Sequence, residues 1–219
     1  MCSCKQFNLE LDSASKHYGT RRILSNVYLK VATGDICALF GRNGTGKSTL
    51  MKMIFGSVKA DYMFLRICDN YIKCAFKHPE LISYLPNDSF LIQNITIKKA
   101  FDLYNINIDN SDEILTRIYN RKVKELSHGE CRYAEVFIVL SANSRFVLLD
   151  EPFNALPPLM IEKVKALITQ KSKDKGIIIA DHRYRDVLKI TNRILLLKDE
   201  TLYELENESE LAAKGYILI

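Results

Sequence analysis

A glycine-rich octapeptide is the part of the sequence best suited to chemistry. Residues 41–48 read Gly-Arg-Asn-Gly-Thr-Gly-Lys-Ser, which fits the phosphate-loop pattern G-x-x-x-x-G-K-[ST] without a mismatch. Glycines let backbone N–H groups turn toward phosphate oxygens, and a following helix adds its positive N-terminal end. Lys47 would reach the β- and γ-phosphates of ATP, and the Ser48 hydroxyl would ligate Mg²⁺. The predicted ATP site comprises Gly41, Arg42, Asn43, Gly44, Thr45, Gly46, Lys47, Ser48 and Thr49.

Two adjacent carboxylates end an apolar run about a hundred residues later. Residues 146–149 are Phe-Val-Leu-Leu, and Asp150 and Glu151 follow them. Ligands of open α/β sheets bind at the carboxyl ends of strands. Asp150 would therefore hold the magnesium through water, and Glu151 would orient and polarise the attacking water. A strand that ends in a solvated acidic turn is the ordinary alternative, and the preceding phosphate loop argues against it.

Short apolar runs alternate with helical patterns around these motifs. Strands are predicted at 36–40, 146–149, 177–180 and 193–197, and helices at 48–55, 130–140, 160–170 and 184–190. This alternation is typical of a parallel sheet covered on both faces. Residues 57–83 contain short β-prone pieces, helical spacing runs from Ile95 to about Asn120 with an interruption at 105–111, and residues from Asn207 on are weakly informative.

Composition narrows the class of protein. The chain has 219 residues and a formal charge of +5, which fits one domain and a phosphate ligand or an anionic membrane surface. Because no basic run is interleaved with aromatic residues, we expect no nucleic acid partner. No apolar stretch reaches 18 residues and no signal segment begins the chain, so we expect a cytosolic protein with reduced thiols. Cys2 and Cys4 could hold a metal, but no second pair completes a site.

A pentapeptide between the two motifs carries a family resemblance. Residues 126–130, Leu-Ser-His-Gly-Glu, resemble the signature Leu-Ser-Gly-Gly-Gln of ABC ATPases. The resemblance implies that Ser127, His128, Gly129 and Glu130 face the γ-phosphate of a nucleotide held by a second subunit. An ordinary capping box, with Ser127 as N-cap and Glu130 three residues on, is the alternative, and both can hold together.

Two further residues stand where this family has functional ones. His182 follows the run 177–180 and Asp181, and is similar to the switch histidine that contacts the γ-phosphate. Tyr18 resembles the aromatic residue that stacks on adenine, with a packing tyrosine as the alternative. Residues 181–188 are also reminiscent of the ATPases that drive lipopolysaccharide export or branched-chain amino-acid uptake.

The resemblance implies an α/β fold: a P-loop NTPase core with a mostly parallel sheet, an N-terminal antiparallel β part and an inserted α-helical subdomain that carries the signature. The single ABC ATPase domain, 1–219, would consist of a core at about 1–86 and 144–219 and a helical subdomain at about 87–143. The chain would pair head to tail with itself or a paralogous subunit. It would power integral membrane transporter subunits from the cytoplasmic face of the membrane.

The sequence departs from the family at two places. A magnesium-touching glutamine is expected where Asn87 stands, one methylene shorter, and Gln93 is an alternative ligand. Pro157 replaces an aspartate that couples the two sites of the dimer, and proline offers neither an acceptor nor an N–H. Two other functions stay open: a non-transport ABC ATPase of translation or DNA, and a regulator that scarcely hydrolyses ATP. The cargo and its direction depend on the membrane subunits.

Overall fold

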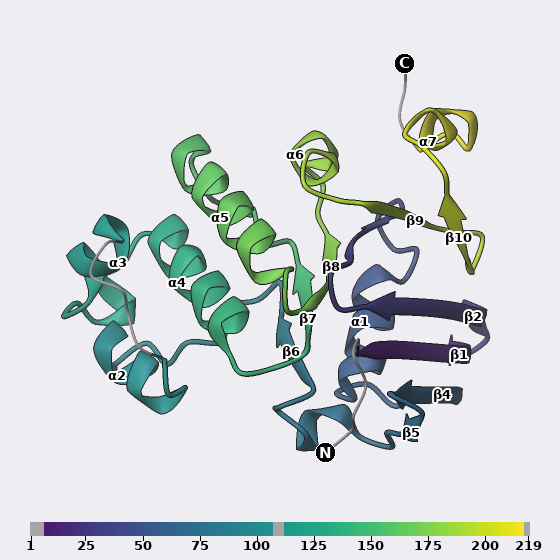
Figure 1. Ribbon diagram of the computed structural model, residues 1–219, viewed down its shortest axis with the longest axis horizontal. Helices are drawn as coiled ribbons and strands as arrows, with labels where there is room; N and C mark the ends of the chain where they lie inside the picture. The colour runs from purple at the N-terminus through teal and green to yellow at the C-terminus, as the bar shows by residue number, and fades with distance from the viewer. Residues whose placement is uncertain (1–6, 107–111, 217–219) are drawn as a thin grey trace.

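A six-stranded sheet runs through the molecule in the computed structural model, which describes residues 7–106 and 112–216 (Figure 1). From edge to edge its strands are β10 (Thr201–Leu205), β9 (Arg193–Lys198), β3 (Ile36–Phe40), β8 (Gly176–Ala180), β7 (Phe146–Asp150) and β6 (Ile82–Leu85). All are parallel except β10, which pairs antiparallel with β9. Every residue of β3, β7 and β8 is buried, as continuous apolar runs predict for strands covered on both faces. The four predicted strands are confirmed.

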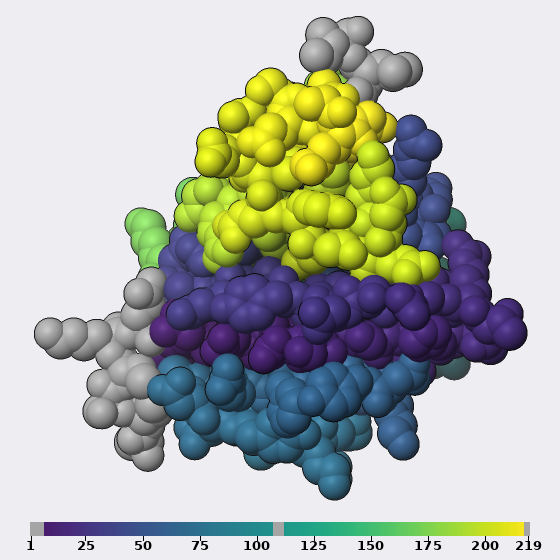
Figure 2. Space-filling model, turned by 90° about the vertical axis from the view of Figure 1, so that its right-hand side faces the viewer, coloured from purple at the N-terminus to yellow at the C-terminus, as the bar shows by residue number. Residues whose placement is uncertain are grey.

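A second sheet is antiparallel and formed mainly by the first part of the chain. Its strands, in spatial order, are β2 (Arg21–Ala32), β1 (Asn8–Tyr18), β4 (Tyr62–Ile67) and β5 (Asn70–Tyr71). Figure 2 shows β1 and β2 as a purple band between the yellow C-terminal part and the blue segment that contains β4 and β5. Leu9 pairs with Val31 and Leu11 with Leu29, and all four side chains are buried. One face of this sheet therefore belongs to the core, as period-two alternation requires.

Alternate residues of the central strands face two separate hydrophobic cores. Leu148 and Ile178 pack with the antiparallel sheet and with α1 (Lys47–Phe55). Their neighbours Val147 and Ile177 pack with the helices on the opposite face. Those helices include α4 (His128–Ser141) and α5 (Pro158–Lys171), which lie side by side (Figure 1).

The helical insertion lies between β6 and β7 and contains α2 (Ile97–Leu103), α3 (Glu113–Ile118) and α4. The long helical spacing predicted there is divided because two residues each start a new helix. The Thr96 side chain accepts a hydrogen bond from Lys99 N, and Asp112 accepts from the backbone of the first turn of α3. The predicted fold class is confirmed, whereas the subdomain boundaries at 87 and 143 stay a prediction.

Two short α-helices, α6 (Tyr184–Leu188) and α7 (Ser209–Ala213), and two 3-10 helices, η1 (Ala75–Lys77) and η2 (Val123–Glu125), complete the description. Both α7 and β10 lie where the sequence predicted no element. Cys2, Cys4 and residues 107–111 of the predicted interruption at 105–111 lie outside the described residues. Within the described parts of the chain, no helix combines the length and apolar character needed to cross a membrane.

Candidate active site

A hollow of about 320 Å³ lies where the phosphate loop joins α1. Its lining comes from Ile23, Asn43, Gly44, Gly46, Lys47, Ser48, Thr49, Asp150, Glu151 and His182. The loops after β3, β7 and β8 meet here because these strands are parallel neighbours whose carboxyl ends share one edge of the sheet. The structure thus brings together most of the predicted phosphate loop, the acidic pair and the predicted switch histidine. These residues stand about 100 and 30 positions apart in sequence.

The phosphate loop is shaped for an anion. Gly46 has a φ of +107°, and a Cβ there would lie 2.7 Å from Ile23 Cγ2, so only glycine fits. Helix α1 follows without a side-chain cap, which leaves N–H groups of its first turn open. Lys47 Nζ donates to the carbonyl oxygens of Gly41 at 2.6 Å and Arg42 at 3.2 Å. Burial lowers the pKa of Lys47, and the acidic pair opposes this shift.

Asp150 is the buried member of the acidic pair, at 2% exposure. Burial raises the pKa of Asp150, while the Ser48 and Tyr84 hydroxyls favour its charged form. Tyr84 donates to Asp150 Oδ2 at 3.3 Å. The hydroxyl of Ser48 and this carboxylate suit Mg²⁺, which takes oxygen ligands and is commonly held by one or two carboxylates plus substrate phosphates. No cluster of three acidic, histidine or cysteine side chains suited to a metal occurs in the described residues.

Glu151 and His182 face each other across the hollow. Their Oε1 and Nε2 atoms lie 3.0 Å apart, and both side chains retain solvent access. Asp181 fixes this geometry, since its carboxylate accepts hydrogen bonds from Phe153 N at 2.9 Å and Arg183 N at 2.8 Å. It thereby ties the loop after β7 to the loop after β8. Sequence reasoning missed Asp181, although an acid directly after a buried apolar run was a usable signal.

Arg132 on α4 is a second residue that the sequence did not reveal. Its guanidinium is buried and donates to the carbonyl oxygens of both acidic residues, Asp150 and Glu151. It also donates to Pro86 O at 2.8 Å and pairs with the buried Glu135 at 3.3 Å. The helix that opens with the signature is therefore bonded directly to the backbone that carries the acidic pair.

The signature residues do not line the hollow of their own chain. Ser127 Oγ accepts from Glu130 N at 3.2 Å, and Glu130 Oε2 accepts from Ser127 N at 2.9 Å, so the capping box is confirmed. Gly129 packs on the next loop, where an added Cβ would lie 2.8 Å from Ala155 O and 3.3 Å from Pro157 Cδ.

A second hollow, of about 450 Å³, lies between the loop after β6 and the start of α4. Asn87, Gln93 and His128 line it, and neither Asn87 nor Gln93 reaches the phosphate-loop hollow. Asn87 Oδ1 instead accepts from Asn154 Nδ2 at 3.5 Å. A magnesium contact of Asn87 therefore stays a prediction that needs movement of this loop.

Three predicted ATP-site residues have their side chains elsewhere. Arg42 and Thr45 line a different hollow, behind the phosphate loop. Tyr18 is 51% exposed, with Lys16 Nζ 5.2 Å from the centre of its ring, and it does not line the phosphate-loop hollow, whereas Ile23 does. Stacking of Tyr18 on adenine stays a prediction.

Comparison with known proteins gives one consistent family. The family model described as ABC transporter matches residues 24–154, more than half of the chain. The chain is 28% identical to the lipopolysaccharide export system ATP-binding protein LptB of Haemophilus influenzae, over 86% of each chain. The Escherichia coli K12 protein of the same name gives the same identity and coverage.

Solved structures agree on the fold. An ATP-binding subunit of an ABC transporter superposes with a TM-score of 0.80 at 20% identity, over 95% of this chain and 93% of that one. A bacterial Atm1-family exporter with ATP bound gives 0.80 at 20% identity, over 96% of this chain and 41% of that one. Together with the phosphate loop, the acidic pair and the signature, these matches show that the chain belongs to the ABC transporter family, as an ATP-binding subunit that hydrolyses ATP to power transport.

Proposed function

We propose that the chain binds Mg-ATP in the phosphate-loop hollow and hydrolyses it there with Glu151 as the general base. The observation that carries this proposal is the convergence of Lys47, Ser48, Asp150, Glu151 and His182 on one hollow. The open N–H groups at the start of α1 would bind phosphate oxygens, and Lys47 would leave its loop carbonyls for the β- and γ-phosphates.

Proton transfer is assigned to Glu151. Its carboxylate, 3.0 Å from His182 Nε2, lines the hollow and would accept a proton from a water that lies next to the γ-phosphate. The water oxygen would bond to the γ-phosphorus as the bond from that phosphorus to ADP breaks, which releases ADP and phosphate. His182 would then hydrogen-bond the γ-phosphate, and Ser48 and Asp150 would hold Mg²⁺. When bound, the ion would supply positive charge that offsets the charge of the phosphates.

A second subunit would complete the site. Ser127, His128, Gly129 and Glu130 lie outside the hollow of their own chain, while this hollow is open to solvent. A head-to-tail partner, either a second copy or a paralogous subunit, would bring its signature over the ATP. Binding between two chains would make dimerisation depend on ATP.

The hollow beside Asn87 is the proposed contact with the membrane subunits. It lies next to the network of Arg132 and Glu135, so a short helix seated there would touch residues bonded to the acidic pair. The chain would then act at the cytoplasmic face of the membrane. Crosslinks from cysteines introduced at 88–90 are expected to reach an integral membrane protein, and crosslinks only to ribosomal or DNA-bound proteins would overturn this part.

Glu151→Gln tests the catalytic assignment. The variant is expected to bind Mg-ATP, to turn it over at under about 1% of the parental rate, and to accumulate as an ATP-dependent dimer in light scattering. Glu80→Gln, which alters a carboxylate that is 61% exposed and far from the hollow, is the matched control and should behave as the parent. Turnover of Glu151→Gln near that of the parent would show that another group is the base.

A further inference from the structure

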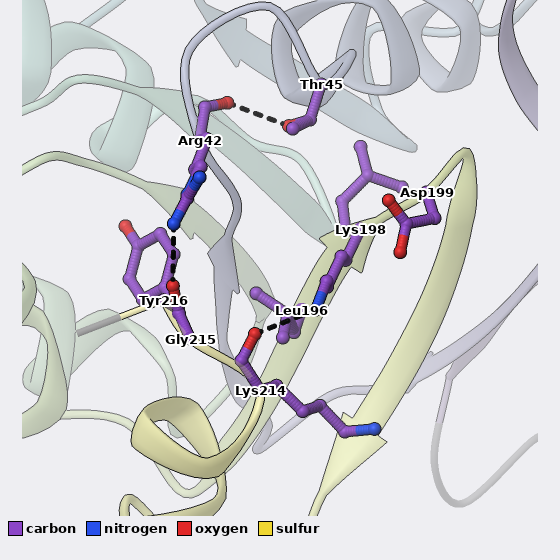
Figure 3. A pocket seen from close by; sticks show the side chains of 9 residues that line it. Arg42, Thr45, Leu196, Lys198, Asp199, Lys214, Gly215 and Tyr216 are labelled. Carbon is purple, nitrogen blue, oxygen red and sulfur yellow. Dashed lines mark hydrogen bonds between the residues drawn. The ribbon is translucent and has the colours of Figure 1, made fainter. Parts of the chain in front are cut away.

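A smaller hollow, of about 240 Å³, lies behind the phosphate loop (Figure 3). One wall is formed by Arg42 and Thr45 of the loop, and the opposite wall by Lys214, Gly215 and Tyr216, which follow α7. Residues 209–216 are called here the 209–216 segment, and its last three residues lie against the phosphate loop. The nucleotide hollow opens on the other side of this loop and shares no lining residue with the smaller one.

The 209–216 segment is held firmly by its own contacts. Leu211 is fully buried, and its carbonyl oxygen accepts a hydrogen bond from Tyr216 N at 2.8 Å. Gly215 adopts a φ of +72°, the left-handed conformation that ends many helices. Lys198 of β9 donates to Lys214 O at 2.9 Å, a favourable place for a cation at a helix C-terminus. The segment is therefore a fixed support.

Gly215 and Tyr216 of this support contact the phosphate loop. The Tyr216 ring stacks on Phe40, with centroids 5.4 Å apart and planes at 29°. The Tyr216 hydroxyl also accepts a hydrogen bond from the backbone N–H of Gly41, which directly follows Phe40. Arg42 Nη2 donates to Gly215 O at 3.0 Å, while Arg42 O accepts from Thr45 Oγ1 at 2.9 Å (Figure 3). Arg42 O is also one of the two carbonyl oxygens that accept a hydrogen bond from Lys47 Nζ.

We propose that the 209–216 segment positions the phosphate loop for ATP, and that Arg42 acts through this segment and does not touch the nucleotide. The contacts of Gly215 and Tyr216 are made at the first residues of the loop, where the backbone leaves β3. A loop fixed at that point presents its N–H groups without an ordering cost on binding. This inference rests on the proposed ATP site, and Tyr216 and Arg42 are positioning residues in it.

Tyr216→Ala tests the stacking contact. Its affinity for Mg-ATP, measured by calorimetry, is expected to fall roughly three- to tenfold, the range for side chains coupled to a site they do not touch. KM for ATP should rise by the same factor with kcat unchanged, because Glu151 and His182 are not involved. Tyr216→Phe keeps the ring on Phe40 and loses only the hydrogen bond of the hydroxyl to Gly41, so it should recover most of the affinity. Tyr203→Ala, which removes an aromatic ring that also contacts the segment through Lys214, is the matched control and should match the parent.

A double-mutant cycle tests the role of Arg42. If Arg42 acts through the segment, Arg42→Ala weakens binding in the parent and adds little in Tyr216→Ala, so the two effects are not additive. Fully additive effects would mean that Arg42 acts independently of Tyr216, which overturns the proposal for Arg42. Hydrogen exchange of the amides of 41–46 should be faster in Tyr216→Ala and unchanged in Tyr203→Ala.

A loss of stability in Tyr216→Ala has to be separated from a loss of ATP affinity. If Tyr216→Ala lowers the midpoint of thermal unfolding, Tyr216→Leu, which refills the space against Phe40, replaces it in the affinity measurement. Parental affinity in both variants overturns the proposal. The affinity of Lys47→Ala for Mg-ATP is measured in the same experiment. If Lys47→Ala loses ATP binding, the proposed ATP site is supported whatever the result for Tyr216. If Lys47→Ala binds ATP like the parent, the proposed function itself is wrong.

Discussion

Two helices of this chain begin at motifs that face phosphate in the family, and their first turns differ. Helix α1 starts after Gly46 in a left-handed conformation, with no side-chain cap and no acidic residue in its first turn. Helix α4 starts after Ser127, whose side chain and that of Glu130 satisfy each other's backbone N–H groups. The start of α1 therefore offers free donors, whereas α4 has already used two of its own.

This difference means that α1 can bind phosphate as it stands, whereas the start of α4 cannot do so equally well. A phosphate can bind at α1 without breaking any hydrogen bond of the loop except those of Lys47. At α4, the Glu130 carboxylate would face an incoming phosphate, but Arg117 at 3.1 Å and Arg121 at 3.5 Å offset its charge. A helix N-terminus is thus a ready anion site only when the residues before it leave its N–H groups free.

The largest expected effect is at the open helix. Lys47→Ala removes the cation aimed at the β- and γ-phosphates, so affinity for Mg-ATP should fall by roughly a hundredfold or more, about 3 kcal/mol. Calorimetric titration measures this. Lys59→Ala, an exposed lysine just beyond α1, is the control and should bind as the parent. Equal affinity in the two variants would mean that α1 is no more a phosphate site than α4.

The next largest effect is expected at Arg132, which bonds α4 to the backbone of Asp150 and Glu151 beside the phosphate loop. Arg132→Leu leaves Glu135 as an unpaired buried charge, which should cost about 3–5 kcal/mol in the free energy of unfolding in urea. The double variant Arg132→Leu with Glu135→Leu should regain much of this stability. Its turnover should still be lower on the order of tenfold, because Asp150 O and Glu151 O have lost the donor that positions them. Full recovery of turnover would show that Arg132 serves only to neutralise Glu135.

Local sequence patterns predicted the phosphate loop and its strands better than the role of Arg132 on α4. The strands β3, β7 and β8 and the phosphate loop follow from contiguous apolar runs and glycines, whose conformations are set locally. Arg132 looked like an ordinary charge on a helix, and its partners stand 18 or more residues away in the sequence, apart from Glu135. The direction of a long side chain depends on such distant contacts.

Arg42 shows the same limit inside a motif. The pattern fixes the backbone of residues 41–48, and the structure has that backbone at the hollow. It does not fix where the Arg42 guanidinium goes, which depends on the carbonyl of Gly215. Residues from Asn207 on carried too little periodicity to predict α7, so this partner could not be foreseen.

A smaller effect is expected at the loop that packs on the signature. Pro157→Asp introduces the carboxylate that the family resemblance predicts between the two sites of the dimer. The coupling free energy between the sites should rise by about 1–2 kcal/mol, seen as higher turnover or higher cooperativity in ATP. Position 157 is also the N-cap of α5, which has no side-chain cap, so an aspartate would stabilise this helix as well. Pro157→Asn adds the cap without the charge, and Pro157→Ala frees the backbone without either. If all three variants share one turnover and one Hill coefficient, the missing carboxylate does not limit coupling.

The smallest effect is expected at the capped helix itself, with Glu130→Gln. Glutamine keeps the acceptor of the capping box, so the free energy of unfolding at pH 7 should fall by less than about 1 kcal/mol. The Ser127 backbone N–H, with help from Arg121 and Arg117, holds the pKa of Glu130 below its ordinary value. A depressed carboxyl pKa adds stability that is present above the ordinary glutamate pKa of about 4.3 and is lost as the pH falls through the folded value.

The free energies of unfolding of the parent and Glu130→Gln should therefore differ by a constant amount near neutral pH and converge in acid.

Removing the Glu130 carboxylate also leaves Arg117 and Arg121 free to attract the partner's ATP, so turnover should rise by about twofold at low salt and less at high salt. Glu125→Gln, which changes the same charge at the neighbouring capped turn, is the control and should leave turnover unchanged. Turnover of Glu130→Gln could instead fall by the same factor at all salt concentrations. That result would mean that the ion pairs of Glu130 with Arg117 and Arg121 hold the signature in shape, and that the Glu130 carboxylate assists ATP binding in the dimer.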